Sequence, residues 1–246
     1  MASGGSTEVH SEVANWRRIL PNLATSLTLL LGLGAIEAAR SGDADLALRF
    51  ILLAVLADGI DGVLARRLGV ASSFGGHLDA LADLVAFGIA PGVLFATQNA
   101  AASGPVRIGL IACIALAGAW RLARFQADAP RSEFVGLPIT VGGPLFALAV
   151  GGVLRADLGG AIAWGIALAI LMVSRVPYPR FTSGRLGRAA WISAAVFIAL
   201  LVIDGRGAMV IAHLGLATYV IWGLWRGFVV MAPRTRQVTD DRARRD

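Results

Sequence analysis

The chain has 246 residues, of which 57% are hydrophobic and only 15% charged, with a mean hydropathy of +0.71. This composition excludes an ordinary soluble domain and indicates an integral membrane protein. The net charge is +6 and every basic residue is arginine. Because the arginines lie at predicted helix ends and in short loops, we expect anionic lipid headgroups and phosphate-bearing substrates as partners rather than nucleic acid.

Apolar runs of nearly membrane-spanning length recur along the chain. We expect a polar or interfacial segment over residues 1–18, which Pro21 and Asn22 break from a membrane domain over 19–231. A charged cytoplasmic tail is predicted over 232–246. The pattern favours an all-α, polytopic membrane helix bundle with about eight transmembrane helices, at residues 19–39, 46–66, 75–97, 106–125, 137–154, 158–176, 188–203 and 208–230.

The placement of arginine predicts the orientation of this bundle. With the N-terminus in the cytoplasm, all but five of the 22 basic residues fall on the cytoplasmic side; the five are Arg40, Arg49, Arg107, Arg155 and Arg206. Since basic residues concentrate in cytoplasmic loops, both termini are predicted to be cytoplasmic. The expected location is the inner cell membrane, as a multi-pass protein.

Two acids interrupt the second predicted helix. Asp58 and Asp61 share one helix face with the small residues Gly62 and Ala65, because these positions follow the i, i+3, i+4, i+7 spacing. Asp58 lies eight residues before Arg66, so it sits about 12 Å below the cytoplasmic helix end. A site built on this face is therefore predicted to open toward the cytoplasm.

Two more acids lie on the third predicted helix. Gly75, Asp79 and Asp83 follow one another at four-residue spacing and share one face. An acid at membrane depth costs about 2.5–3.5 kcal/mol on insertion scales, so four acids need a compensating charge. If the two helices pack antiparallel, the four carboxylates converge, and clustered carboxylate oxygens suit hard divalent cations such as Mg²⁺ or Mn²⁺.

This stretch resembles the signature of the CDP-alcohol phosphotransferase family, in which acids, small residues and an arginine recur at fixed spacing. The resemblance implies an enzyme that cleaves the pyrophosphate of a CDP-linked lipid, passes the phosphatidyl group to an alcohol and releases CMP. It also implies a helix bundle around a cytoplasm-facing site, in a homodimer. The matching positions are Asp58, Asp61, Gly62, Ala65, Arg66, Gly75, Asp79 and Asp83.

The resemblance also implies roles for single residues. Asp58, Asp61 and Asp79 would hold two divalent ions, Mg²⁺ or Mn²⁺, with Asp58 and Asp79 bridging them. Asp83 would complete the second metal site and act as general base. The implied substrate contacts are Gly62, Ala65 and Gly75, which admit the cytidine nucleotide, Arg66 and Ser72, which contact the CDP group, and Asn22 and Thr25 at the start of the first membrane helix.

Further stretches are similar to the bacterial and archaeal phosphatidylserine synthase branch of the family. This similarity implies that the substrates are CDP-diacylglycerol and L-serine and that membrane lipids surround the protein. The stretches are residues 20–25, 87–91, 121–125, 136–138 and 174–181.

Several alternatives remain open at the level of sequence. Arg121 and Arg124 share a helix face near a cytoplasmic end, where they either bind the acceptor carboxylate or a lipid phosphate, or only anchor the helix.

The same chemistry is also open to other substrates. The acceptor could be glycerol 3-phosphate, inositol or inositol phosphate in place of serine, or the lipid could be an archaeal ether. A carboxylate-lined divalent cation transporter explains the acids but not the spacing of the small residues and Arg66. A noncatalytic membrane scaffold predicts that losing the acids is harmless.

Overall fold

The structure is a computed structural model and describes residues 5–70, 72–127, 134–152, 154–178, 197–201 and 203–231. Within these ranges it is mostly helical, and two short strands, β1 (Phe134–Val135) and β2 (Pro177–Tyr178), pair antiparallel. The helices are α1 (Gly5–Arg40), α2 (Ala44–Leu68), α3 (Ser73–Asp83), the π-helical η1 (Leu84–Ile89), α4 (Ala90–Gln98), α5 (Gly104–Ala127), α6 (Ile139–Gly151), α7 (Leu158–Val173) and α9 (Gly205–Met231).

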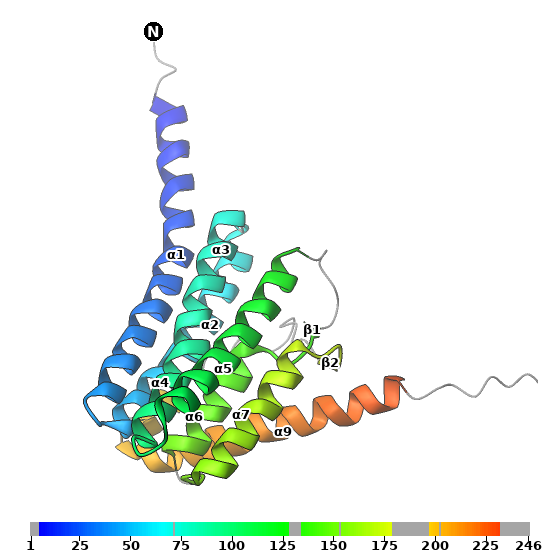
Figure 1. Cartoon of the computed structure of the whole chain (residues 1–246). Helices are drawn as coiled ribbons and strands as arrows, with labels where there is room; N and C mark the ends of the chain where they lie inside the picture. Colours follow the sequence, from blue (N-terminus) through cyan, green and yellow to red (C-terminus); the bar gives the residue numbers. More distant parts are fainter. Residues whose placement is uncertain are drawn as a thin grey trace, which may run out of the picture.

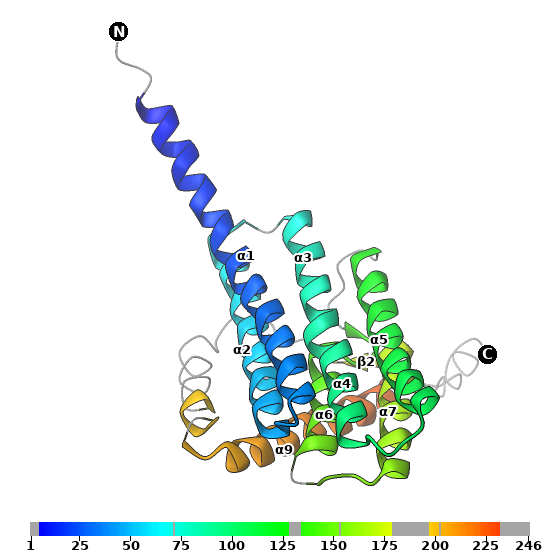
Figure 2. The same cartoon turned by 60° about the vertical axis from the view of Figure 1, so that its left-hand side comes forward.

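Helices α1 to α7 run along roughly one axis, and α9 crosses them obliquely near one end (Figures 1 and 2). Four described helical stretches are long and apolar enough to cross a membrane: Ile19–Arg40, Ser73–Gln98, Gly104–Ala127 and Gly205–Phe228. The apolar helices α6 and α7 are shorter. The predicted all-α membrane architecture is confirmed at this level, whereas the count of eight spans and the orientation of the termini stay predictions.

Two predicted helices need separate comment. The helix α2 is 25 residues long but carries acids and arginines along its length, which lower its hydropathy. In the predicted helix at 188–203, residues 197–201 and 203 are helical, and the remainder lies outside the described residues.

The predicted break at Pro21 is wrong. The helix α1 continues from Gly5 to Arg40 with Pro21 inside it. A proline removes one backbone hydrogen bond from a helix, and such a loss is tolerated when neighbouring groups satisfy the backbone and packing holds the helix. Here Pro21 is buried, so packing against neighbouring helices holds the chain in helical conformation at this point. The chain at Pro21 is therefore part of one long helix.

The third predicted helix contains a π-helical turn that its sequence explains. Pro91 has no N–H to donate to the carbonyl of Phe87 four residues earlier. The turn widens at this point, with the N–H of Ala90 donating to Val85 five residues back. The freed carbonyl of Phe87 lies against Gly143 of α6, where any Cβ atom would collide with it. The helices η1 and α6 thus come into close contact at the carbonyl to which Pro91 cannot donate.

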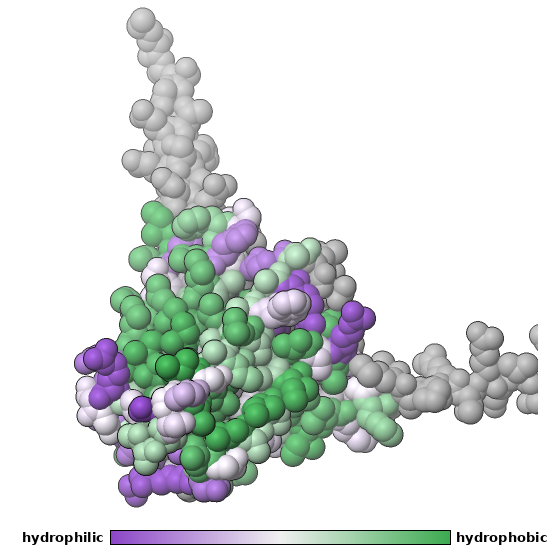
Figure 3. Space-filling view, viewed as in Figure 1, coloured by the Kyte–Doolittle hydropathy of each residue, from purple (hydrophilic) through white to green (hydrophobic). Residues whose placement is uncertain are grey.

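The core lies where η1 and α4 pass between α1, α5 and α6. Phe87 and Leu94 are fully buried there, and Phe95 packs on Phe146 with ring centroids 6.0 Å apart. Figure 3 shows hydrophobic residues covering the middle of the face seen in Figure 1, with hydrophilic residues gathered toward the ends of the bundle. This distribution fits a bundle surrounded by lipid.

Candidate functional site

The turn between α2 and α3, the two helices that carry the acids, lies at one end of the bundle (Figure 2). Gly69, with a φ of +64°, ends α2 in the left-handed conformation, and its N–H reaches the carbonyls of Ala65 and Arg66. Ser72 then starts α3 as its N-cap, because its hydroxyl accepts a hydrogen bond of 3.1 Å from the N–H of Gly75. The observed role of Ser72 is capping, and its predicted contact with the CDP group stays a prediction.

Three carboxylates from the two helices meet beside this turn. Asp58 and Asp61 of α2 and Asp79 of α3 each offer an oxygen, and these oxygens lie within 4.8 Å of one another. Asp61 is buried, and the other two are partly buried. The structure therefore shows the juxtaposition of these three acids that helical spacing predicts.

Asp83 lies one turn further along α3, next to this group. It is 5% exposed and interacts with Asp58 across the interface. Its Oδ1 atom is buried and has no hydrogen-bond partner among the residues that the structure describes. Because buried polar atoms are normally paired, this oxygen is available to a ligand. The roles of Asp83 as metal ligand and base stay predictions.

Thr25 connects α1 to the acidic cluster. Its buried hydroxyl lies 2.6 Å from Oδ2 of Asp61 and holds that carboxylate in place. The sequence predicts Thr25 as a substrate contact, and the structure instead shows it contacting a proposed metal ligand. A direct contact with the nucleotide stays a prediction.

Two glycines beside the acids let neighbouring polar side chains come close to the backbone. A Cβ atom on Gly62 would lie 3.3 Å from the guanidinium of Arg66, which folds back over it from the next turn. A Cβ atom on Gly75 would lie 3.2 Å from the hydroxyl of Ser72 and 3.4 Å from Oδ1 of Asn22. Arg66 thus lies over Gly62 on the same helix, and Asn22 of α1 lies beside Gly75 of α3.

The two arginines of α5 differ in their surroundings. Arg124 donates to the carbonyls of Val135 (2.7 Å) and Val173 (3.0 Å), so its guanidinium ties the end of α7 to β1. Arg121 is only 6% exposed. Among the charged side chains around it, Asp83 interacts with it most strongly. Arg121 is therefore under the electrostatic influence of the acidic cluster, whereas Arg124 is seen in a structural contact, and the substrate roles of both arginines stay predictions.

Two residues with long-range contacts were missed by sequence reasoning. Gln126 donates a hydrogen bond of 2.6 Å to the carbonyl of Gly76, fastening α5 to the first turn of α3. Tyr219 of α9 stacks on Tyr178 of β2, with ring centroids 5.7 Å apart. Neither residue stands at a spacing that signals these contacts, since each contact joins elements far apart in the sequence.

The donor set fits a divalent cation. All the converging atoms are carboxylate oxygens, which hard cations such as Mg²⁺ prefer, and softer metals would call for histidine or cysteine. The unpartnered oxygen of Asp83 lies beside this group. The residues present are therefore compatible with divalent metal binding.

Comparison with known proteins identifies the family. A sequence model of the CDP-alcohol phosphatidyltransferase family matches residues 18–229. A CDP-diacylglycerol–serine O-phosphatidyltransferase from Helicobacter pylori (strain J99) is 30% identical over 226 residues, which cover 87% of this chain and 92% of the relative. One from Mycobacterium leprae is 32% identical over 218 residues (80% and 69%). An archaetidylserine synthase from Methanothermobacter thermautotrophicus is 33% identical over 164 residues (65% and 70%). The family match covers the whole acidic cluster and most of the chain, and this protein belongs to the CDP-alcohol phosphatidyltransferase family.

Proposed function

We propose that this protein makes phosphatidylserine, by transferring the phosphatidyl group of CDP-diacylglycerol to L-serine with release of CMP. The observation that carries the proposal is the meeting of Asp58, Asp61 and Asp79 next to the unpartnered oxygen of Asp83. The names of the relatives from H. pylori and M. leprae support serine as the acceptor. A cation transporter or a scaffold is not favoured, because the family match includes the whole acidic cluster.

The acidic cluster would hold two divalent ions, Mg²⁺ or Mn²⁺. Asp58, Asp61 and Asp79 are the proposed ligands, with Asp83 completing the second site. When bound, these ions neutralise the phosphate oxygens and the departing CMP during an in-line displacement. Thr25 keeps Asp61 oriented through its hydrogen bond, so the ligand geometry is set before substrate arrives.

Asp83 is the proposed general base. It takes the proton from the serine hydroxyl, while the serine oxygen bonds to the phosphorus that carries diacylglycerol. The bond from this phosphorus to the bridging oxygen breaks, and CMP leaves with the electron pair. Arg121 lies beside Asp83 and would bind the serine carboxylate. Because the hydroxyl and carboxylate of serine hang from the same Cα, this grip directs the hydroxyl toward Asp83.

The cytidine nucleotide would lie over the small residues at the mouth of the site. Gly62, Ala65 and Gly75 are the small residues of this surface, and Arg66, whose guanidinium lies over Gly62, would offer it to the diphosphate. Asn22 and Ser72, which lie against Gly75, are proposed further contacts, and so is Thr25, which lies against Asp61.

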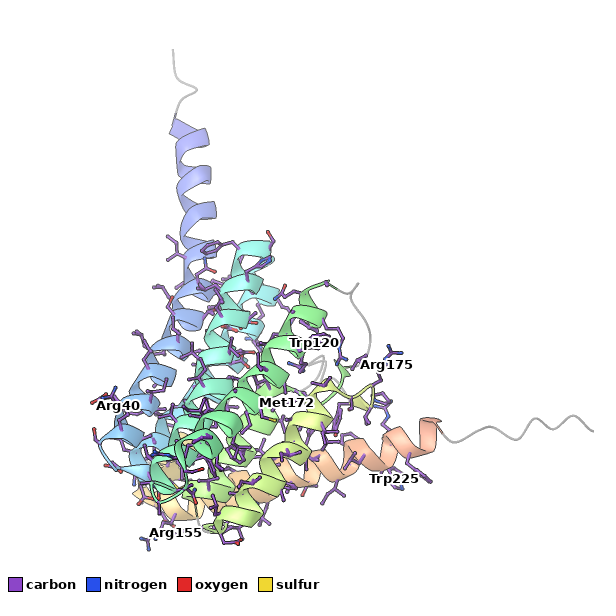
Figure 4. The ribbon with its side chains drawn as sticks, in the orientation of Figure 1. Arg40, Trp120, Arg155, Met172, Arg175 and Trp225 are labelled. Atoms are coloured by element: carbon purple, nitrogen blue, oxygen red, sulfur yellow. The ribbon has the colours of Figure 1, made fainter. Side chains whose placement is uncertain are left out.

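We infer that the site faces the cytoplasm of a bacterial-type inner membrane. Figure 4 shows Arg40 and Arg155 near one end of the bundle and Arg175 toward the other. The arginine bias places the end that carries Arg40 and Arg155 outside, and the opposite end, where α2 turns into α3, inside. A homodimer remains part of the proposal, on the basis of the family resemblance alone.

An acceptor screen tests the proposed function. Purified protein with CDP-diacylglycerol and Mg²⁺ or Mn²⁺ is expected to release CMP with L-serine, and not with glycerol 3-phosphate, inositol or inositol phosphate. Asp58→Asn is expected to abolish release, while Asp45→Asn, the same change at an exposed position of the same helix, is not. CMP release with another acceptor but not with serine would overturn the acceptor, and normal release by Asp58→Asn would overturn the site.

A further inference from the structure

One side chain of α5 binds the backbone at the beginning of α3. The amide nitrogen of Gln126, in the last turn of α5, donates a hydrogen bond of 2.6 Å to the carbonyl of Gly76, in the first turn of α3. A backbone carbonyl can accept two hydrogen bonds, so Gln126 can bind it while α3 stays helical. Gly76 lies between Gly75 and Asp79, which are a proposed nucleotide contact and a member of the carboxylate cluster. The contact thus joins α5 to the part of α3 that forms the site.

The first turn of α3 has a weak intrinsic tendency to be helical. It contains two adjacent glycines, Gly75 and Gly76. Glycine loses more backbone freedom on folding than any other residue, so each glycine in a helix costs about 1 kcal/mol relative to alanine. The Ser72 cap satisfies the N–H of Gly75. The turn therefore depends on contacts with other elements to stay in place.

The helices around α3 give this turn support on two sides. Among the described elements, α3 packs mainly on α1 and makes sparse contact with α5, and α2 is not one of its main neighbours. Helices α2 and α3 meet instead through the carboxylates of the cluster. Support for the first turn therefore comes from α1, where Asn22 lies beside Gly75, and from α5, where Gln126 binds Gly76. Since α3 and α5 pack sparsely, the hydrogen bond of Gln126 is a large part of the support from α5.

We propose that Gln126 is a positioning residue for the nucleotide: its hydrogen bond keeps the first turn of α3 helical, so that Gly75 presents the surface over which the cytidine nucleotide lies. This inference rests on the proposed function. Without Gln126 the turn frays, and binding of CDP-diacylglycerol must then also order it. The cost of this ordering lowers the affinity for the nucleotide lipid. The acceptor is proposed to bind at Asp83, further along α3, and its affinity should not change.

The first test removes the hydrogen-bond donor and then restores it. Gln126 is exposed, so Gln126→Met keeps the length of the side chain, removes the donor and disturbs no core packing. This variant is expected to raise the KM for CDP-diacylglycerol about fivefold, the effect of losing one hydrogen bond, with the KM for L-serine unchanged. Amide hydrogen exchange over residues 73–80 should become faster. Gln126→Lys, which regains a donor, should resemble the wild type, and so should Gln98→Met, the same change at an exposed position of α4.

The second test adds Gly76→Ala to Gln126→Met. A Cβ atom on Gly76 would lie 3.5 Å from the amide of Gln126, an ordinary contact distance, so there is room for the methyl group. Alanine favours the helix over glycine. The double variant is therefore expected to recover most of the affinity for CDP-diacylglycerol and the slow hydrogen exchange. A residue that contacts the substrate directly could not be replaced in this way.

Each result either supports the inference or overturns it. An unchanged KM for CDP-diacylglycerol in Gln126→Met overturns it, as does unchanged hydrogen exchange. An equal rise in both KM values also overturns it, because this indicates general loosening of the fold. A defect that Gly76→Ala does not relieve shows that Gln126 acts on the substrate rather than on the turn. Failure of the wild type to release CMP with serine refutes the proposed function separately, since hydrogen exchange at the turn is measured without substrate.

Discussion

At the scale of single residues, the site is organised by which oxygens have partners and which do not. Oδ2 of Asp61 receives the hydroxyl of Thr25 at 2.6 Å, whereas Oδ1 of Asp83 is buried with no partner among the described residues. A carboxylate oxygen held by a hydrogen bond is suited to a fixed ligand role, and an oxygen without a partner is free to accept one during the reaction. Asp61 and Asp83 thus differ in whether a neighbouring side chain fixes the orientation of the carboxylate oxygen.

Thr25→Val is expected to weaken metal use without changing the fold. The substitution keeps the branched shape and removes the hydroxyl that orients Asp61, so the divalent cation concentration for half-maximal activity should rise about tenfold, the lower end of the usual effect of such supporting contacts. Thr28→Val is the matched control, because Thr28 is buried one turn later on α1 and its hydroxyl reaches only the carbonyl of Ala24, at 3.4 Å. Equal cation dependence in the two variants would contradict the positioning role of Thr25.

Asp83→Asn is expected to separate chemistry from binding. Removal of a positioned base lowers the rate by about 10²–10⁴, and this loss should appear in single-turnover CMP release. Binding of CDP-diacylglycerol should persist, because Asp58, Asp61 and Asp79 remain. If binding and the chemical step fall by the same factor, Asp83 acts chiefly as a metal ligand and another group takes the proton.

At the scale of elements, close contact between helices depends on a few glycines. Gly143 of α6 lies on the carbonyl that Pro91 leaves free at Phe87, and Gly32 of α1 lies against Ala86, where a Cβ atom would come within 2.8 Å of its Cα. These contacts hold α1 and α6 on η1, the turn that directly follows Asp83. Packing around η1 therefore supports the acid that faces the substrate.

Gly143→Ala is expected to destabilise the bundle. The added methyl group collides with the Phe87 carbonyl and forces α6 outward, at a cost of about 1–3 kcal/mol. Gly109→Ala in α5 is the matched control, because an added Cβ meets nothing there, and the change should be neutral or stabilising by about 1 kcal/mol. Thermal unfolding in detergent measures both. A melting temperature for Gly143→Ala equal to that of the wild type would show that α6 adjusts without cost.

How far the sequence predicts this structure depends on the range of the contact. The helical spacing of Asp58, Asp61 and Asp79 suffices to place their oxygens together, because one short turn joins the two helices. The same reasoning fails at Pro21, where tertiary packing keeps α1 continuous. It cannot find the stacking of Tyr178 on Tyr219, because β2 and α9 are brought together only by the tertiary fold.

At the scale of the whole molecule, family membership and the carboxylate cluster together predict that activity depends on a divalent cation. CMP release is expected to disappear after exhaustive treatment with EDTA and to return when Mg²⁺ or Mn²⁺ is added back. The protein should remain folded by circular dichroism, because its core is apolar and separate from the cluster. Full activity in chelator would rule out the two-metal mechanism.

The π-helical turn has a further consequence for how this chain tolerates deletions. Each residue of an α-helix turns the chain by about 100°, so a helix with one residue fewer presents a different side to its neighbours. Deleting a single residue within Leu84–Ile89 would let the backbone close into regular α-helix, yet it would rotate everything beyond it relative to α3. Leu94 and Phe95, now fully buried, would leave the core while Asp79 and Asp83 kept their places. The extra residue of the π-helical turn thus sets the rotation of α4, which forms the core, relative to α3, which carries the acids.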